Sequence, residues 1–231
     1  MSLPLFLVPS LDIDVLDGPE GHHAADVMRL RMGERLLLGD GCGGTACAVV
    51  TAVGKGRLEL STVERRYTDP PAPRLVVAQG IAKGERGELA VQAMTEVGVD
   101  EIVPWAAARS VARWKDDRPL RRWRATAREA AKQARRAWLP VVSEPVSTGA
   151  LAARVTFVLH EEATARLSTV DVPERDEVVL VVGPEGGVAL EELAAFTAAG
   201  AVPVRLGDTV LRTSTAGVAA LALLSGRLGR W

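Results

Sequence analysis

Cysteine and histidine are scarce in this sequence, which has two cysteines and three histidines among 231 residues. Cys42 and Cys47 lie in CGGTAC without companions at the spacing of metal ligands, and cysteines this close are more often small buried residues than a disulfide. Three histidines without nearby thiolates do not make a metal set. We therefore expect no metal centre, no disulfide and a reducing cytoplasmic compartment.

Long apolar runs are also absent, although 48% of the residues are hydrophobic. No segment approaches the roughly 20 consecutive apolar residues that a membrane-spanning helix needs. The first residues, MSLPLFLVPSLDID, lack a basic leader and soon reach two aspartates, so they do not resemble a signal peptide. We expect a soluble, globular chain with one good-sized core, or one core plus a small satellite domain, and no membrane partner.

The order of apolar segments predicts two domains. Up to about residue 67, short strand-like runs alternate with glycine and aspartate turns, which favours a small β-barrel. The proline-rich TDPPAPR at 68–74 can continue neither a helix nor a central strand, so we place domains at 1–70 and 74–231. Strand candidates at 75–80, 100–105, 156–160, 178–182 and 202–206 then indicate an α/β fold with a mainly parallel sheet. Helices are expected within 84–98, with Leu89 and Met94 on its apolar face, from Pro119, at 190–199 and at 213–224.

A glycine-rich loop follows an apolar strand in VVLVVGPEGGVALEEL, residues 178–193. Glycines beyond the carboxyl end of a parallel strand let the backbone approach a ligand and present its own amides and carbonyls. The loop lacks the lysine and hydroxyl of a P-loop and the spacing of a dinucleotide fingerprint. Ala189 offers no side chain to cap the next helix, so its first amides need another partner. A ligand loop and a simple tight turn both remain open.

A second candidate is RLGDTVLRTSTAGVAALALL, residues 205–224. The hydroxyls of Thr213, Ser214 and Thr215 are placed to cap the following helix. Arg212 stands beside apolar Leu211, and a charge near a core must be paired or used. An ordinary buried C-terminal helix is the alternative reading of this segment.

Charge is unevenly distributed, although the net charge is only −1. Residues 109–136 contain eleven basic and three acidic residues, a net charge of +8 that leaves −9 for the rest of the chain. Basic residues at three- and four-residue steps predict a stripe along one helix, formed by Arg121, Arg124, Arg128, Lys132 and Arg135. A solvated face is the usual explanation of such a stripe, but the near absence of compensating acids in the segment favours contacts with phosphates.

Taken together, these segments resemble one known family. GPEGG after an apolar strand, followed by LGDTVLRTSTA, is similar to the cofactor-binding pair of the SPOUT superfamily of knotted RNA methyltransferases. The chain also resembles the 16S ribosomal RNA (uracil-N3) methyltransferase family in AQGIAKGERGELAVQAMTEVGVDEIVPW, ARSVARW, RRWRATAREAAKQARR and HAADVMRLRMGE. The similarity runs through nearly the whole chain in the expected order.

The resemblance implies a PUA-like β-barrel that helps to grip RNA, followed by a SPOUT α/β domain whose last part forms a trefoil knot around S-adenosylmethionine. The cofactor would be recognised by backbone groups, which explains the absence of a phosphate-binding lysine. The residues implied in cofactor binding are Leu159, His160, Gly183, Pro184, Glu185, Gly186, Gly187, Leu206, Gly207, Val210, Leu211, Thr213, Thr215 and Ala216.

The implied reaction is methylation of N3 of a specific uridine in 16S rRNA, within the 30S small ribosomal subunit, by a cytoplasmic homodimer that needs no metal. We expect Arg212 to stabilise the base anion, with Glu185 as a second catalytic candidate that orients or deprotonates the base. The small residues after Thr215 could serve the dimer interface. The residues expected to contact RNA are His23, Arg29, Arg31, Arg109, Arg121, Arg122, Arg124, Arg128, Arg135 and Arg136.

Three positions depart from the family pattern. The chain has Ser214 where LRTETA would place a glutamate, Ala189 where a hydroxyl residue is usual, and Arg135 as an added arginine. Because position 214 carries a hydroxyl, it has no carboxylate that could take part in catalysis. Two other functions stay open: a noncatalytic RNA-binding or ribosome-assembly protein, and a SPOUT methyltransferase with another RNA target.

Overall fold

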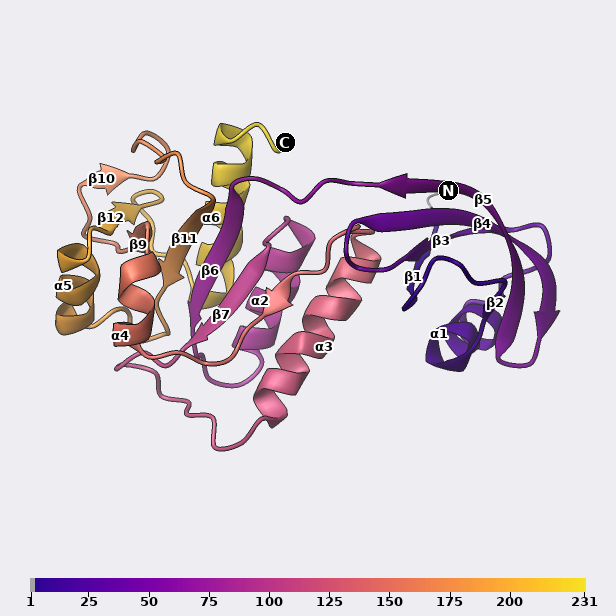
Figure 1. Cartoon of the computed structure of the whole chain (residues 1–231). Coiled ribbons are helices and arrows are strands. Elements are labelled where there is room, and N and C mark those ends of the chain that lie inside the picture. The colour runs from indigo at the N-terminus through magenta and orange to yellow at the C-terminus, as the bar shows by residue number, and fades with distance from the viewer. Residues whose placement is uncertain (1–2) are drawn as a thin grey trace. The chain divides into compact units, whose positions relative to one another are not determined.

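The computed structural model describes residues 3–231 and divides into two compact units (Figure 1). One unit comprises Met1–Pro70 with Ala131–Leu139, and the other comprises Pro71–Ala130 with Pro140–Trp231. The chain first passes from one unit to the other within the proline-rich segment. Each unit has its own hydrophobic core.

The first unit is built on a five-stranded sheet with the order β1-β3-β4-β5-β2. Its strands are β1 (Leu5–Leu7), β2 (Val15–Leu16), β3 (Arg35–Gly39), β4 (Gly44–Gly54) and β5 (Arg57–Tyr67). Buried and partly exposed residues alternate along β4, so one face of the sheet covers the core that contains Phe6, Leu38 and Leu58. No pairing between β1 and β2 occurs within residues 3–231, and the expected small barrel is therefore an open half-barrel.

Short helical turns and a returning segment complete this unit. The helix α1 (Gly18–His22) and the π-helical turn η1 (His23–Val27) follow β2. Lys132 Nζ forms an ion pair of 3.0 Å with Glu20, and both side chains are largely buried. Trp138 Nε1 donates to the Thr68 carbonyl at 2.8 Å. These contacts attach residues 131–139 to the first unit.

The second unit contains a seven-stranded, entirely parallel sheet within the described residues, in the order β10-β12-β9-β11-β6-β7-β8. Its strands are β6 (Arg74–Gly80), β7 (Glu101–Trp105), β8 (Val141–Val142), β9 (Phe157–Leu159), β10 (Ala165–Arg166), β11 (Glu177–Val182) and β12 (Val202–Arg205). Helices connect them: α2 (Arg86–Glu96), α3 (Arg118–Gln133), α4 (Thr148–Leu151) with the turn η2 (Ala152–Arg154), α5 (Leu190–Ala198) and α6 (Thr213–Arg227).

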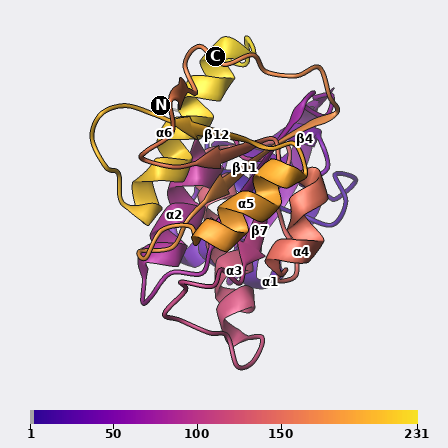
Figure 2. The same cartoon turned by 90° about the vertical axis from the view of Figure 1, so that its left-hand side faces the viewer.

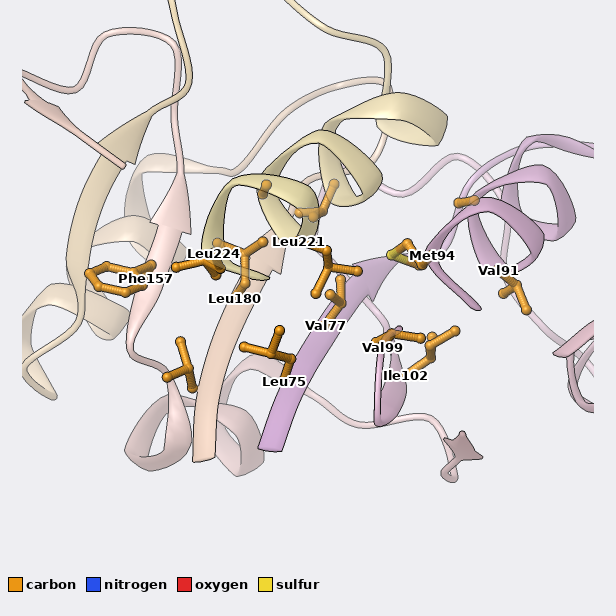
Figure 3. Close-up of a cluster of buried hydrophobic side chains, with 14 of the residues drawn as sticks. Leu75, Val77, Val91, Met94, Val99, Ile102, Phe157, Leu180, Leu221 and Leu224 are labelled. Carbon is orange, nitrogen blue, oxygen red and sulfur yellow. The ribbon is translucent and has the colours of Figure 1, made fainter. Parts of the chain in front are cut away.

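Alternate residues of the central strands enter two separate cores. Leu75 and Val77 of β6 pack with α2, α3 and α6, and Figure 3 shows Val77 among Leu180, Leu221 and Leu224. Val76 and Ala78 of the same strand pack instead with α4, η2 and α5. The helices α4 and α5 lie side by side on that face of the sheet (Figures 1 and 2). Because both faces are covered, β6 and β11 are almost continuously apolar.

The strands and long helices lie close to their predicted ranges. One detail was wrong: Leu89 is 55% exposed, and the buried face of α2 is formed by Ala90, Val91 and Met94. The short elements β8, β10 and α4 were missed, because two to four residues give too little periodicity to detect. None of the helices within residues 3–231 has both the length and the apolar character required to cross a membrane.

The two cysteines are both free, but Cys42 is exposed rather than buried, so the expectation of two buried residues was wrong for that position. Cys47 is partly exposed on β4. Within the described part of the chain, no group of three or more histidine, cysteine, aspartate or glutamate side chains is arranged to hold a metal ion.

Candidate functional site

A cavity of about 490 Å³ opens in the second unit, where the loops after β9, β11 and β12 meet the start of α6. These loops follow the carboxyl ends of parallel strands, the usual location of ligand sites in α/β sheets. The cavity is within the 300–1,000 Å³ range of small-molecule pockets.

The structure gathers nearly all residues predicted to bind a cofactor around this cavity. Thr215 is the exception: it does not line the cavity, and its hydroxyl donates to the Arg212 carbonyl at 3.1 Å. The predicted residues that line it are Leu159, His160, Gly183, Pro184, Glu185, Gly186, Gly187, Leu206, Gly207, Val210, Leu211, Thr213 and Ala216, together with Arg212.

Sequence reasoning missed a further set of lining residues: Arg86, Glu161, Val182, Val188, Val204, Arg205 and Thr209. Most of these are immediate neighbours of predicted residues. Arg86 is different, because it lies at the start of α2, about 100 positions before the glycine loop. The signal for it was available, since Arg86 follows the carboxyl end of the predicted strand 75–80.

Close backbone contacts explain the glycines of this loop. A Cβ on Gly80, the last residue of β6, would lie 2.5 Å from the Pro184 nitrogen. A Cβ on Gly186 would lie 3.0 Å from Cβ of Arg109, and Gly187 has φ of +72°, a conformation that favours glycine. The glycine loop is therefore tightly packed between the end of β6 and the segment after β7.

A hydroxyl fixes the glycine loop to the start of α6. Thr213 Oγ1 donates to the Gly183 carbonyl at 2.7 Å and accepts from Gln79 Nε2 at 2.8 Å. Gln79 is fully buried at the end of β6. The prediction that hydroxyls cap α6 was wrong: the N-cap residue is Arg212, and no side chain caps the helix there. Thr213 instead joins the start of α6 to the glycine loop and to the end of β6.

Two guanidinium groups at the cavity have different surroundings. Arg212 is exposed, and no partner for its guanidinium is found among residues 3–231; the expected position near a core was therefore wrong. Arg86 forms an ion pair of 3.3 Å with Glu185. The same Glu185 oxygen accepts from the Lys83 amide at 3.0 Å. Glu185 is thus occupied by Lys83, between β6 and α2, and by Arg86 at the start of α2, whereas Arg212 is available to a ligand.

The start of α5 has a partner that the sequence analysis overlooked. Glu192 Oε2 accepts from the amide of Ala189, the N-cap residue, at 3.2 Å. This bond satisfies the Ala189 amide but not the amides of the first turn of α5, which no side chain caps within the described residues. The expectation that those first amides need another partner therefore stays a prediction.

Basic residues on α3 have acidic neighbours, one of them close in sequence and two of them distant. Arg121 pairs with Asp117 at 2.6 Å, Arg122 with Glu88 at 3.3 Å, and Arg124 with Glu144 at 3.0 Å. Arg128, Arg135 and Arg136 also have partners. The near absence of compensating acids holds only within residues 109–136, because Glu88 and Glu144, outside that segment, pair with two of its arginines. The helix ends at Gln133, and Arg135 lies beyond it with φ of +54°.

The remaining residues predicted to contact RNA lie on exposed segments. Arg109, in the second unit, donates to the Gly186 carbonyl at 3.2 Å. In the first unit, the ring of His23 lies 6.1 Å from the ring of Phe6, and Arg29 has φ of +57°. Arg29 and Arg31 follow η1, and Arg31 is exposed.

Comparisons with known proteins place the chain in a family. Residues 69–225 match the family described as "RNA methyltransferase domain", and residues 16–63 match "RNA methyltransferase PUA domain". The chain is 47% identical to Ribosomal RNA small subunit methyltransferase E of Mycobacterium bovis, across 98% of this chain and 93% of that protein. It is 30% identical to the Bacillus subtilis protein of the same name, across 91% and 88%.

Solved structures agree with this assignment. A Ribosomal RNA small subunit methyltransferase E from Neisseria gonorrhoeae, bound to S-adenosyl methionine, has a TM-score of 0.87 at 26% identity and covers 98% of both chains. A methyltransferase from Legionella pneumophila in complex with SAM has the same TM-score at 27% identity. The predicted fold class, a PUA-like N-terminal domain followed by a SPOUT α/β domain, is confirmed. The chain belongs to the ribosomal RNA small subunit methyltransferase E family of RNA methyltransferases.

Proposed function

We propose that the cavity binds S-adenosylmethionine (SAM) and that the protein methylates N3 of a specific uridine in 16S rRNA of the small ribosomal subunit. The observation that carries this proposal is the cavity itself, which combines the glycine loop, the loop before α6 and the end of β9. Two solved relatives, from Neisseria gonorrhoeae and Legionella pneumophila, are described as bound to SAM. The name of the Neisseria gonorrhoeae protein, Ribosomal RNA small subunit methyltransferase E, also agrees with methylation of ribosomal RNA.

The lining of the cavity fits this cofactor. Leu159, Val182 and Leu206 supply apolar surface for an adenine ring, while the glycine loop offers backbone donors and acceptors. No P-loop pattern is present in the sequence, in keeping with a ligand that carries no phosphate. Bound SAM supplies an electrophilic methyl group on a sulfonium, so the residues of this chain need only bind, orient and prepare the uracil.

Arg212 is our candidate for stabilising the base. Uracil N3 carries an imide proton and becomes a good nucleophile only when that proton leaves and the anion is stabilised. Arg212 lines the cavity, and its guanidinium has no partner in the described part of the chain. Glu185 already accepts from Lys83 and Arg86, so we propose that it orients Arg86 at the cavity rather than removing the proton. The reacting edge of uracil must be unpaired, which favours an extruded nucleotide.

RNA binding is proposed for both units. Residues 1–70 would form the RNA-gripping domain and residues 74–231 the methyltransferase domain. The arginines of α3 would still reach phosphates despite their acidic neighbours, because exposed ion pairs are weak and exchange readily with a polyanion. We also retain the trefoil knot, a homodimer and a cytoplasmic location as proposals. Gly217 and Ala220 of α6 are buried within the chain, where α6 packs against α2, so a dimer would use other residues of that helix.

The experiment that tests this function is transfer of labelled methyl from SAM to small subunits lacking the modification. Free 16S rRNA and transfer RNA serve as controls, and mass spectrometry locates the methyl group. Label at uridine N3 supports the proposal, and the preferred substrate shows whether the assembled subunit is recognised. SAM binding without labelled substrate would indicate another RNA target. Absence of SAM binding would favour a noncatalytic RNA-binding or ribosome-assembly protein.

A further inference from the structure

Glu192 is a buried carboxylate outside the cavity, in the first turn of α5. Glu192 is only 6% exposed, and no basic side chain pairs with its carboxylate among residues 3–231. A buried carboxylate without a cation must be stabilised by hydrogen-bond donors. The positions of those donors therefore show which segments of the chain the carboxylate holds together.

Three donors from three segments converge on this carboxylate. Oε1 accepts from the Ala108 amide at 2.8 Å and from Thr148 Oγ1 at 2.8 Å. Oε2 accepts from the Ala189 amide at 3.2 Å. Thr148 in turn accepts from Trp105 Nε1 at 3.1 Å, which holds its hydroxyl proton toward Glu192. The carboxylate thus joins the segment after β7, the start of α4 and the end of the glycine loop.

The segment after β7 touches the glycine loop directly. Arg109, the residue after Ala108, donates from its guanidinium to the Gly186 carbonyl at 3.2 Å. A Cβ on Gly186 would lie 3.0 Å from Arg109 Cβ and 3.1 Å from the Arg109 carbonyl oxygen, so the two backbones are packed without spare room. Glu192 therefore fixes the loop from both sides, at Ala189 directly and at Gly186 through the Ala108–Arg109 backbone.

We propose that Glu192 is a positioning residue for the SAM-binding loop. It accepts from the Ala189 amide at the end of the loop and holds Arg109 against Gly186, which sets the direction of the loop's backbone groups. Both oxygens of the Glu192 carboxylate accept hydrogen bonds. Glutamine at this position has only one acceptor oxygen, and its NH2 group would face a donor in place of the second oxygen, which disturbs the arrangement. The inference rests on the proposed function, since it requires that the cavity binds SAM.

The test compares SAM affinity in E192Q, in E191Q and in the wild-type chain by calorimetric titration. Glu191 is the neighbouring exposed glutamate of the same helical turn and has no partner among the described residues, so E191Q is a matched control. We expect Kd for SAM to rise roughly tenfold in E192Q, from one buried donor left unsatisfied, and to stay unchanged in E191Q. T148V, which removes one of the three donors, should give a smaller rise and covers the case in which E192Q does not fold.

Thermal unfolding of the same proteins separates positioning from simple stabilisation. If E192Q or T148V melts at a lower temperature but binds SAM with wild-type Kd when folded, the positioning role is overturned while the proposed function stands. If the wild-type chain does not bind SAM, both proposals fail together. Hydrogen exchange provides the second readout: faster exchange at Gly186 and Ala108 in the folded E192Q protein is expected, and unchanged exchange contradicts the inference.

Discussion

Gly80→Ala is the substitution that most directly tests the architecture of the cavity. Gly80 ends β6 at the point where the strand meets the glycine loop. A Cβ there would lie 2.5 Å from the Pro184 nitrogen, 2.7 Å from its Cδ and 2.9 Å from the Gly183 carbonyl carbon. All three atoms belong to backbone or to a proline ring, so no flexible side chain can move aside.

The magnitude follows from this crowding. Forcing extra atoms into a well-packed region costs about 1–3 kcal/mol, either as strain or as displacement of the neighbour. If the strain remains in the folded protein, the melting temperature falls by about 2–4 °C for each kcal/mol. If the loop moves instead, the same energy appears as weaker SAM binding, at about a tenfold change in Kd per 1.4 kcal/mol. We therefore predict that the loss in free energy of unfolding and the loss in free energy of SAM binding together amount to about 1–3 kcal/mol.

The assay measures both losses in one preparation, by thermal unfolding without ligand and by calorimetric titration with SAM. Gly226→Ala serves as the control, because a Cβ on Gly226 in the last turn of α6 meets no atom within 4 Å. Alanine in a helix is more favourable than glycine by about 0.5–1 kcal/mol, so this control should be neutral or slightly stabilising. Wild-type stability together with wild-type SAM affinity in G80A would refute the close packing of β6 against the glycine loop.

Three further predictions concern charges. Arg212→Ala should lower the rate of methyl transfer roughly 10²–10³-fold, measured with labelled SAM at saturating concentration; a full rate would remove Arg212 from the reaction. Glu185→Gln should lower kcat by no more than roughly tenfold and leave its pH dependence unchanged, because Glu185 orients Arg86; loss of the acidic limb of the pH–rate profile would identify Glu185 as the base instead. The Arg154 guanidinium, through a hydrogen bond to Glu177, lowers the pKa of that carboxyl below its ordinary 4.5, so the stabilisation is present above this value and is lost as the pH falls through the folded pKa. Glu177→Gln should therefore be less stable than wild type between about pH 5 and 7, with a difference that shrinks below about pH 4 in urea unfolding experiments; a difference independent of pH would contradict this coupling.

Much of the fold could be predicted because the signals are local. Apolar runs such as 178–182 are long enough to mark buried strands, and the prolines of 68–74 mark the place where the chain leaves the first unit. Closure of the barrel could not be predicted, because pairing of β1 with β2 depends on the curvature of the whole sheet. The exposed position of Leu89 was also missed, since a helical wheel shows an apolar stripe but not which neighbours cover it.

The sequence by itself determined the glycine loop, the hydroxyl-rich turn before α6, the basic segment and the family to which they belong. Tertiary structure alone decided how these parts are used. Gln79 and Thr213 are 134 positions apart and meet only because β6 and β11 are adjacent in the sheet. The pairing of Arg86 with Glu185, and of Glu192 with Ala108, likewise follows from the strand order. Local patterns report what each segment can form, whereas the partner of a charge or a hydroxyl is set by which segments the sheet brings together.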